Sequence, residues 1–575
     1  MLPSPQGGSL FNENNKLPLW GMGALKFIKI MKKISLPVAI LASATAVAAE
    51  QQKPNIIMVM VDDMGFSDIQ PYGGYEIETP NLTRLANEGT RFCQFYNNGI
   101  SAPTRASLIT GQYQHKAGLG FFNNNLGLAA YQGFLNKESL TFAEVLKRAG
   151  YTTLMSGKWH VGDDRDQWPN QRGFDHFFGF IGGASSYYEV DDNRNSVTSV
   201  RFIKDNEEYH LKDGEYLTDV ITDNAIEFLD GQKNEKKPFF LYLAFNAPHW
   251  PLQAKKEDIA KYKGKFSIGW DSLRQVRLQN AIKQGVVPVS QQLAKHDDEI
   301  PLWRTLPYDE QKYWERRQEV YAAMIDRVDQ EIGRVLRKLK QMKQDKNTLI
   351  IFISDNGAQG GIGAVSRSRG NYSVGDPGSY EVQNKYWSQT GNAPFREYKG
   401  ICYEGGISAP LIAWFPGKIK KGRIVKGVGH LIDLAPTFYD LAGAEYPTEY
   451  NGVKTNALPG KSLLPILFGG KEEVEREKPL CWERAGNKAV RLGKWKYVSV
   501  KDGVDELYDI ENDRSERFDV AAEHPDIVDK LKKHYTEWAE ANDVVDFKLL
   551  RNPWGAADNR KNNVVNRKNG EVRTR

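Results

Sequence analysis

The stretch Asn55-Ile56-Ile57-Met58-Val59-Met60-Val61-Asp62-Asp63 decides the fold class of this chain. Its apolar run indicates a buried strand, and two adjacent acids follow it at once. Three further apolar runs also end in polar clusters: residues 151–155 at Ser156-Gly157-Lys158-Trp159-His160, residues 238–245 at Asn246-Ala247-Pro248-His249, and residues 348–353 at Ser354-Asp355-Asn356-Gly357.

Helical patterns lie between these strands, at residues 82–88, 139–150, 216–229 and 315–342. Strands that alternate with helices predict an α/β domain on a largely parallel sheet. Ligands of such sheets bind beyond the carboxyl ends of the strands. One polar cluster there would be an ordinary turn, but four of them predict an active site.

Length and composition set the outline of the molecule. The chain has 575 residues, 40% of them hydrophobic, which favours a large domain plus a smaller one. The net charge is +5 and no block of like charge is long, which argues against a nucleic-acid partner. We expect the cysteines Cys93, Cys402 and Cys481 to be buried thiols, because their number is odd and their spacing fits no metal site.

The N-terminal region has the pattern of a secretory signal peptide. Met31-Lys32-Lys33 precedes an apolar run at residues 36–47, and small residues follow up to Ala49. The run is shorter than the roughly 20 residues that a membrane anchor needs. We therefore predict export to the periplasm or medium, with no stable membrane insertion after signal cleavage.

These patterns divide the chain into four predicted parts. They are an upstream extension and signal peptide (1–49), a catalytic domain (50–475), a small C-terminal domain (476–557) and a disordered tail (558–575).

The acidic clusters indicate a metal site. Asp62, Asp63, Asp355 and Asn356 are oxygen donors without thiolates or paired histidines beside them, a set that suits Ca²⁺ or Mg²⁺ rather than zinc. Asp62-Asp63 alone would be a turn or a helix cap. The second pair on another strand end favours the metal.

The segment Ser101-Ala102-Pro103-Thr104-Arg105-Ala106-Ser107-Leu108-Ile109-Thr110-Gly111 predicts a short helix, because proline suits the first turn and glycine the end. Ser101 would lie at its N-terminus, where free N–H groups favour an anion, and Arg105 one turn later could reach the same place. In a generic sequence of this kind, Ser101 would simply cap the helix and Arg105 would lie on the surface.

The segment beginning Ser-Ala-Pro-Thr-Arg resembles the signature of the type I sulfatases. The other clusters follow in the family's order, together with Lys399-Gly400-Ile401-Cys402-Tyr403-Glu404-Gly405-Gly406, and Gly65-Phe66-Ser67-Asp68 looks closest to the bacterial arylsulfatases. The resemblance implies an alkaline-phosphatase-like fold: a large mixed, mostly parallel sheet flanked by helices, and a small C-terminal domain with an antiparallel sheet and a helix.

The resemblance also implies the chemistry. Ser101 would be converted to formylglycine by a radical-SAM maturating enzyme, since serine at this position marks the serine-type members. One divalent cation, Ca²⁺ by resemblance, would be bound by Asp62, Asp63, Ser101, Asp355 and Asn356. The reaction would release sulfate from a sulfated carbohydrate or an aryl sulfate.

The family also supplies the remaining roles. Arg105 would steady the nucleophile, and Lys158 and Lys399 would hold the sulfate oxygens. His249 would be the general acid and His160 the base. Each of these residues alone has an ordinary structural explanation, and only their occurrence together in this order favours catalysis.

Two alternatives stay open at this point: a metal-dependent phosphatase or phosphodiesterase of the same superfamily, or a non-catalytic binder of sulfated glycans if Ser101 is unmodified. Two long segments are also open. Residues 357–395 are expected to form a substrate-shaping rim, and residues 263–307 a lid or a surface insertion.

Overall fold

The computed structural model describes residues 53–189, 201–360, 372–500 and 503–550, together with Pro553 and the backbone of two short strands near the C-terminus. The predicted signal peptide and residues 361–371 of the predicted rim lie outside these residues. The described elements fall within one compact unit, Gln52–Arg575. Within the described ranges, no helix has both the length and the apolar character needed to span a membrane.

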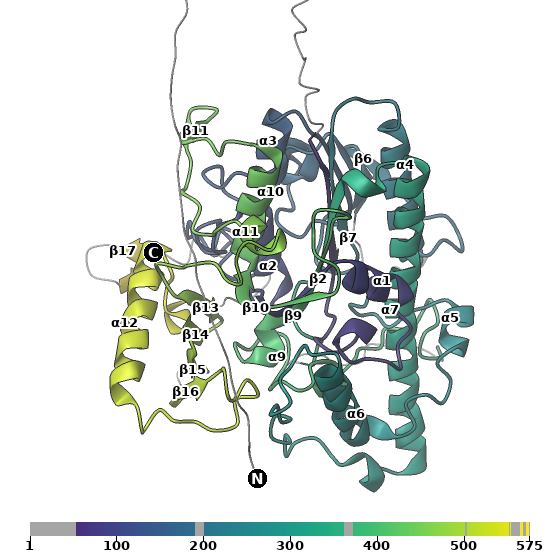
Figure 1. Cartoon of the computed structure of the whole chain (residues 1–575), viewed down its shortest axis with the longest axis vertical. Helices are drawn as coiled ribbons and strands as arrows, with labels where there is room; N and C mark the ends of the chain where they lie inside the picture. The colour runs from purple at the N-terminus through teal and green to yellow at the C-terminus, as the bar shows by residue number, and fades with distance from the viewer. Residues whose placement is uncertain are drawn as a thin grey trace, which may run out of the picture. The chain divides into compact units, whose positions relative to one another are not determined.

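Ten strands form one mixed sheet (Figure 1). They are β1 (Asn55–Val61), β2 (Thr90–Tyr96), β3 (Thr152–Lys158), β4 (His176–Phe180), β5 (Phe202–Lys204), β6 (Glu207–Tyr209), β7 (Phe239–Ala244), β8 (Thr348–Ser354), β9 (Ser408–Trp414) and β10 (Arg423–His430). The spatial order is β10-β2-β9-β8-β1-β7-β3-β4-β5-β6. Strands β8, β1, β7, β3 and β4 run parallel, whereas β9 and β5 are antiparallel to their neighbours. The prediction of a large mixed, mostly parallel sheet is confirmed.

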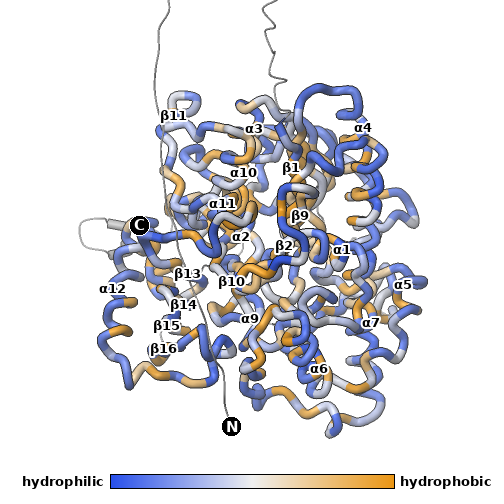
Figure 2. Tube along the Cα trace, in the orientation of Figure 1, coloured by the Kyte–Doolittle hydropathy of each residue, from blue (hydrophilic) through white to orange (hydrophobic). Residues whose placement is uncertain are grey.

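The central position of β1 in the sheet explains why residues 55–61 are almost continuously apolar. Alternate side chains enter two different cores: Ile57 and Val59 pack on one face of the sheet, Ile56 and Met58 on the other. Both faces are therefore buried, as is usual for a parallel sheet. Figure 2 shows the hydrophobic stretches in the central strands and mainly hydrophilic residues along the outer loops.

Helices cover both faces of this sheet (Figure 1). One core contains side chains of α1 (Pro80–Glu88), α4 (Leu217–Gly231), α6 (Gly269–Lys283) and α7 (Tyr308–Gln341). The other contains side chains of α2 (Ser101–Thr110), α3 (Phe142–Arg148) and α10 (Leu434–Ala442). Short helices in the connections are α5 (Lys256–Ala260), α8 (Lys385–Gly391), α9 (Glu404–Ile407) and α11 (Leu464–Leu467).

A small antiparallel sheet follows, in the order β13 (Leu480–Arg484), β14 (Asn487–Leu492), β15 (Trp495–Ser499) and β16 (Asp505–Asp509). Helix α12 (Pro525–Ala541) packs on it through Val528 and Leu531. The prediction of a C-terminal antiparallel sheet with a helix is confirmed. Two small hairpins complete the strands: β11 (Glu449–Tyr450) with β12 (Val453–Lys454), and β17 (Val564–Asn566) with β18 (Glu571–Arg573). The second hairpin lies within the segment expected to be a tail.

Several boundaries differ from the sequence prediction for local reasons. Helix α3 begins at Phe142 because Thr141 and Glu144 form a reciprocal capping box. Helix α7 begins at Tyr308, earlier than expected. The sequence prediction missed its first turns because they are mostly polar and show no apolar periodicity. Strand β3 continues through Lys158.

The segment 263–307 is packed into the core. It contains α6, and Trp270 and Trp303 meet edge to face with ring centroids 4.7 Å apart. Trp270 also contacts Trp387 of α8, and all three side chains are buried. The buried tryptophans of this segment therefore support the core, while Ile268 and Val289 are exposed. All three cysteines are buried free thiols, as predicted.

Candidate active site

Two strand ends bring the four predicted oxygen donors together. Asp62 and Asp63 follow β1, Asp355 and Asn356 follow the adjacent parallel strand β8, and all four are buried. The backbone N–H of Asp63 donates to Asp355 Oδ1 (3.1 Å), and Asn356 Nδ2 donates to Asp63 Oδ1 (2.7 Å). Asp63 has φ 68°, a left-handed conformation that aspartate tolerates and that turns the chain sharply after the strand.

Three oxygen atoms at this point have no hydrogen-bond donor among the described residues. They are Asp62 Oδ1, Asp63 Oδ2 and Asn356 Oδ1, all fully buried. Unpaired buried acceptors are costly, and three that converge suit a cation. The donor set therefore fits the implied divalent ion. The Asp62, Asp63 and His249 side chains also lie close enough to share one ion, and His249 was not predicted as a ligand.

Ser101 is the first residue of α2, as predicted, and Gly111 ends that helix in the left-handed conformation. The Ser101 side chain is buried, and its Oγ accepts a hydrogen bond from Arg105 Nε (3.0 Å). Arg105 Nη2 reaches Asp355 Oδ2 at 3.1 Å and Asp62 Oδ2 at 3.6 Å. One buried guanidinium therefore links the start of α2 to the ends of β1 and β8.

Lys158 is the last residue of strand β3, and His160 follows two residues later. Lys158 Nζ lies 2.5 Å from Asp62 Oδ2, and both side chains are fully buried. Burial would raise the pKa of Asp62, but Lys158, His249 and Arg105 outweigh it and hold that pKa below its ordinary value. Asp62 is thus ionised at neutral pH.

His160 turns toward Ser101. Its Nδ1 lies 3.4 Å from Ser101 Oγ, in a residue with φ 61°. A Cβ on Gly183 would stand 2.5 Å from the imidazole, so a side chain there would displace the ring. Burial, with the charges of Lys158 and Arg105, holds the pKa of His160 well below its ordinary value. The ring is therefore neutral and able to accept a proton.

His249 follows β7, between two cis X-Pro bonds, Ala247-Pro248 and Trp250-Pro251. Its Nδ1 lies 2.7 Å from the Trp250 carbonyl, which can only accept, so Nδ1 carries a proton. Nε2 faces Asp63 Oδ2 at 3.6 Å. Burial lowers the pKa of His249, although Asp63 and Asp62 oppose this effect.

Lys399 reaches the same place from the loop before α9. Its Nζ lies 2.5 Å from Asp63 Oδ1. Burial would lower the pKa of Lys399, but Asp63, Asp62 and Asp355 raise it overall. The structure thus gathers all ten predicted side chains, from four strand ends, one helix and one loop, around one buried charged centre.

Two residues beside this centre were not predicted. Tyr242 of β7 accepts from Arg105 Nη1 through its hydroxyl (3.3 Å). Tyr321 of α7 lies 3.0 Å from the Asp63 carbonyl and 2.8 Å from Asp68 Oδ2. Both look like ordinary core aromatics in sequence, so no local signal could have identified them.

Comparison with known families agrees with the resemblance seen in the sequence motifs. A family model described as "Sulfatase" matches residues 54–444, and one described as "N-sulphoglucosamine sulphohydrolase, C-terminal" matches residues 397–541. An uncharacterized sulfatase of Schizosaccharomyces pombe is 34% identical, over 86% of this chain and 95% of the relative. An arylsulfatase of Klebsiella aerogenes is 34% identical, over 76% of this chain and 95% of the relative.

Solved structures agree in fold. The chain matches Ps i-CgsB in complex with k-i-k-neocarrahexaose with a TM-score of 0.65 and 29% identity, over 86% of this chain and 94% of the other. It also matches a phosphonate monoester hydrolase of Agrobacterium radiobacter with a TM-score of 0.55, over 85% of this chain and 96% of the other. At 18% identity, the second likeness shows the fold alone.

Proposed function

The chain belongs to the sulfatase family and is a sulfate ester hydrolase, and we propose that it works through a formylglycine made from Ser101. The main support for this proposal is that the Ser101 hydroxyl lies within hydrogen-bond distance of Arg105 and His160. The unpaired buried oxygens of Asp62, Asp63 and Asn356 belong to the same charged centre. Oxidation of the Ser101 alcohol to the aldehyde would be done by a radical-SAM maturating enzyme.

The residues present fit such a group. When formed and hydrated, it would supply a hydroxyl that attacks sulfur. Arg105 orients residue 101 through Nε and remains fixed by Asp355. His160, which is neutral, accepts a proton from the residue 101 side chain.

The two lysines bind the anionic part of the substrate. Lys158 and Lys399 already place their ammonium groups at Asp62 and Asp63, so both charges stand where a sulfate would meet the cation site. Such fixed charges stabilise the negative charge that develops as the ester bond breaks.

His249 protonates the departing alcohol in this proposal. Because Nδ1–H is held by the Trp250 carbonyl, Nε2 carries a proton only in the imidazolium form. Burial disfavours that positive charge, whereas Asp63, 3.6 Å away, and Asp62 favour it. Nε2 is thus the atom that would release its proton to the leaving oxygen.

The cation would be held by Asp62, Asp63, Asp355, Asn356 and residue 101, and we propose Ca²⁺. Bound there, it would offset the negative charge of the carboxylates and the sulfate. Thermal melts of chelator-treated protein with Ca²⁺, Mg²⁺ or no metal test this. We expect Ca²⁺ to raise the Tm of the wild type but not of Asn356→Leu, and no response to either ion would contradict the site.

The substrate proposed is a sulfated carbohydrate or an aryl sulfate, met outside the cytoplasm after export. The support is the relatives' names: an arylsulfatase, and an N-acetylglucosamine-6-O-sulfatase of Bacteroides thetaiotaomicron that is 28% identical over 82% of this chain.

The mechanism is tested by expressing the chain with and without a serine-type maturating enzyme. With that enzyme, the peptide that contains residue 101 should lose about two hydrogens, and sulfate release should appear only in that sample. Ser101→Ala should show neither change. The matched variant Ser107→Ala, in the same helix, should still show the mass loss at Ser101. Activity from unmodified Ser101 would overturn the mechanism and favour a metal-dependent phosphoesterase.

A further inference from the structure

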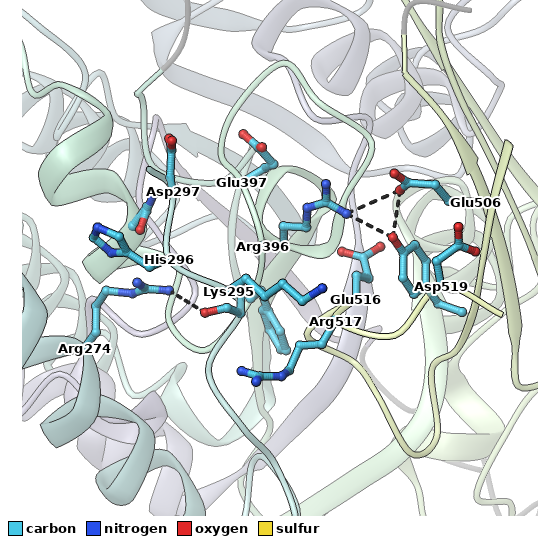
Figure 3. Close-up of a pocket in the computed structure, with 14 residues that line it drawn as sticks. Arg274, Lys295, His296, Asp297, Arg396, Glu397, Glu506, Glu516, Arg517 and Asp519 are labelled. Atoms are coloured by element: carbon cyan, nitrogen blue, oxygen red, sulfur yellow. Dashed lines mark hydrogen bonds and ion pairs between the residues drawn. The ribbon is translucent and has the colours of Figure 1, made fainter. Parts of the chain in front are cut away.

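A separate hollow of about 400 Å³ opens beside the C-terminal sheet (Figure 3). Its walls come from α6, the segment 294–297, the loop Phe395–Glu397, and the C-terminal segment 506–519. An adjoining space of about 430 Å³ shares Arg274, Lys295 and Arg517 with it. No proposed catalytic or metal-binding residue lines either space.

Three cations face this hollow without an ion-pair partner among the described residues. They are Arg274, Lys295 and Arg517, and Figure 3 shows them reaching the hollow from three different segments. Arg274 is only 5% exposed, donates one hydrogen bond to the Ala294 carbonyl (3.2 Å), and has no partner for Nε. Arg517 donates to the Leu293 carbonyl, and its Nε is also unpartnered.

A buried guanidinium without a counter-charge is unusual, because burial penalises the charge. Burial lowers the pKa of Arg274 to about 10, and Asp271 and Asp297 compensate only in part. Gln389, 7% exposed, also lines the hollow, and no hydrogen bond to its amide is found among the described residues. The hollow therefore offers several unused donors.

Three acidic side chains that line the hollow form ion pairs with basic residues other than Arg274, Lys295 and Arg517. Glu506 pairs with Arg396 (3.3 Å), and Asp297 pairs with Lys385 (3.2 Å). Glu516 pairs with Lys496 (2.8 Å).

Two further acids lie on the wall. Asp519 accepts the backbone N–H groups of Leu507 (3.0 Å) and Ala521 (2.9 Å). Glu397 has no ion pair among the described residues, and burial raises its pKa. Four cations and five carboxylates thus line the hollow, and Arg274, Lys295 and Arg517 are the cations among them without an ion pair to a described residue.

We propose that this hollow, the Arg274 hollow, binds a sulfate or carboxylate group through Arg274, Lys295 and Arg517. Planar guanidinium groups match such anions with paired N–H donors. The group could come from free inorganic sulfate or from an anionic saccharide chain, and the second source rests on the proposed function.

The position of the hollow links it to the catalytic centre. Arg396 and Glu397 line it, and Lys399, two residues later, contacts Asp63. A saccharide anchored in the Arg274 hollow would therefore lie against the loop that carries a sulfate-binding lysine.

The test measures binding to protein made without a maturating enzyme, so failure of the formylglycine mechanism does not affect it. Isothermal titration calorimetry would use sodium sulfate and a heparin-derived tetrasaccharide on the wild type, Arg274→Met, Lys295→Met and a control, Arg337→Met. Arg337 is an exposed arginine of α7 with no ion pair among the described residues.

We expect Arg274→Met and Lys295→Met to weaken binding of at least one probe tenfold or more, and Arg337→Met to leave it unchanged. For the component of binding that Arg274→Met removes, tetrasaccharide binding at least tenfold tighter than sulfate would identify a saccharide subsite, whereas equal binding would identify a site for free sulfate. Binding that is equal in all four proteins, or absent in the wild type, would overturn the proposal.

Protein stability provides the folding control. Lys295 is exposed, so its replacement cannot disturb the core. Without ligand, the Tm of Arg274→Met should equal or exceed that of the wild type, because an unpaired buried charge is removed. In matured enzyme, neither variant should change kcat/KM for 4-nitrophenyl sulfate, because no proposed catalytic or metal-binding residue lines the hollow.

Discussion

At the scale of single residues, Arg105 holds the centre together. It is fully buried and contacts Ser101, Asp355, Asp62 and Tyr242. The sequence predicted that Arg105 could reach the helix N-terminus, because a helix brings residues four apart onto one face. It could not predict the link to Tyr242, because that contact depends on how α2 packs against β7.

Replacing the proposed general acid should affect substrates unequally. In matured enzyme, we expect His249→Gln to lower kcat by roughly 10²–10⁴-fold for an alkyl or sugar sulfate, whose leaving group needs a proton. The loss should be much smaller for 4-nitrophenyl sulfate, whose leaving group is stable as an anion. Steady-state kinetics on both substrates would check this.

The matched control is His176→Gln, an exposed histidine of β4 paired with Asp205, which should leave both rates unchanged. Equal losses of His249→Gln on the two substrates would count against the acid role and favour metal binding by His249.

The buried His430 should account for part of the loss of stability at acid pH. It is fully buried, and its Nδ1 accepts the N–H of Ile432 (3.3 Å). Burial, with a smaller contribution from Arg476, lowers its pKa to about 3. The unfolded chain binds this proton near pH 6.5, so stability is lost as the pH falls from about 6.5 toward 3.

The upper bound of this loss is about 5 kcal/mol, from the size of the shift. His430→Asn can keep the cap to Ile432 but does not titrate. We expect its free energy of unfolding, measured in urea, to fall less between pH 6.5 and 4 than that of the wild type. If the free energy of unfolding falls equally in both proteins over this pH range, His430 does not contribute to the acid sensitivity.

At the scale of elements, close strand contact at β3 positions Lys158 and His160. Gly157 has φ 120°, and a Cβ there would stand 1.9 Å from the Ala244 carbonyl of β7. A side chain would push β3 from β7 just before the two functional residues.

We therefore expect Gly157→Ala to destabilise the fold by several times more than Gly150→Ala. Gly150 also has a positive φ, 89°, but nothing lies within 4 Å of the added Cβ, so the cost there is about 1 kcal/mol. Chemical denaturation measures both variants. Equal losses would mean that β3 and β7 are not held this closely.

The sequence predicted the central parallel strands but not the outer ones. Strand β1 was found because burial on both faces leaves a continuous apolar run. Strand β2 carries Arg91 and Gln94, β9 contains Pro410, and β10 lies at the edge with polar residues. Their place in the sheet depends on distant pairing, such as Tyr96 with Ser408, which no local pattern records.

At the scale of the whole molecule, a buried charge cluster joins the C-terminal sheet to the main sheet. Glu404, in the motif after Lys399, accepts from Lys496 of β15 (3.0 Å), Arg514 (2.8 Å) and Tyr96 of β2 (2.8 Å). Burial would raise the pKa of Glu404, but Lys496, Arg514 and Arg491 lower it to about 2. The C-terminal sheet thus holds the start of α9, close to the catalytic loop.

Breaking this cluster should cost far more than breaking a surface pair. We expect Glu404→Gln to destabilise the protein by about 3–5 kcal/mol, because Arg514 loses its buried counter-charge and Lys496 keeps only Glu516. The control Lys532→Met removes the exposed pair with Asp505 in the same region and should cost at most about 1 kcal/mol. Similar losses in denaturant titrations would show that the cluster does not join the two sheets.

The central claim is that residue 101, once oxidised, carries the reaction. The most direct measurement determines the aldehyde fraction at residue 101 by peptide mass spectrometry, and sulfate release per mole of chain, in preparations matured to different extents. We predict a straight line through the origin. Substantial sulfate release extrapolated to zero aldehyde would contradict the formylglycine mechanism.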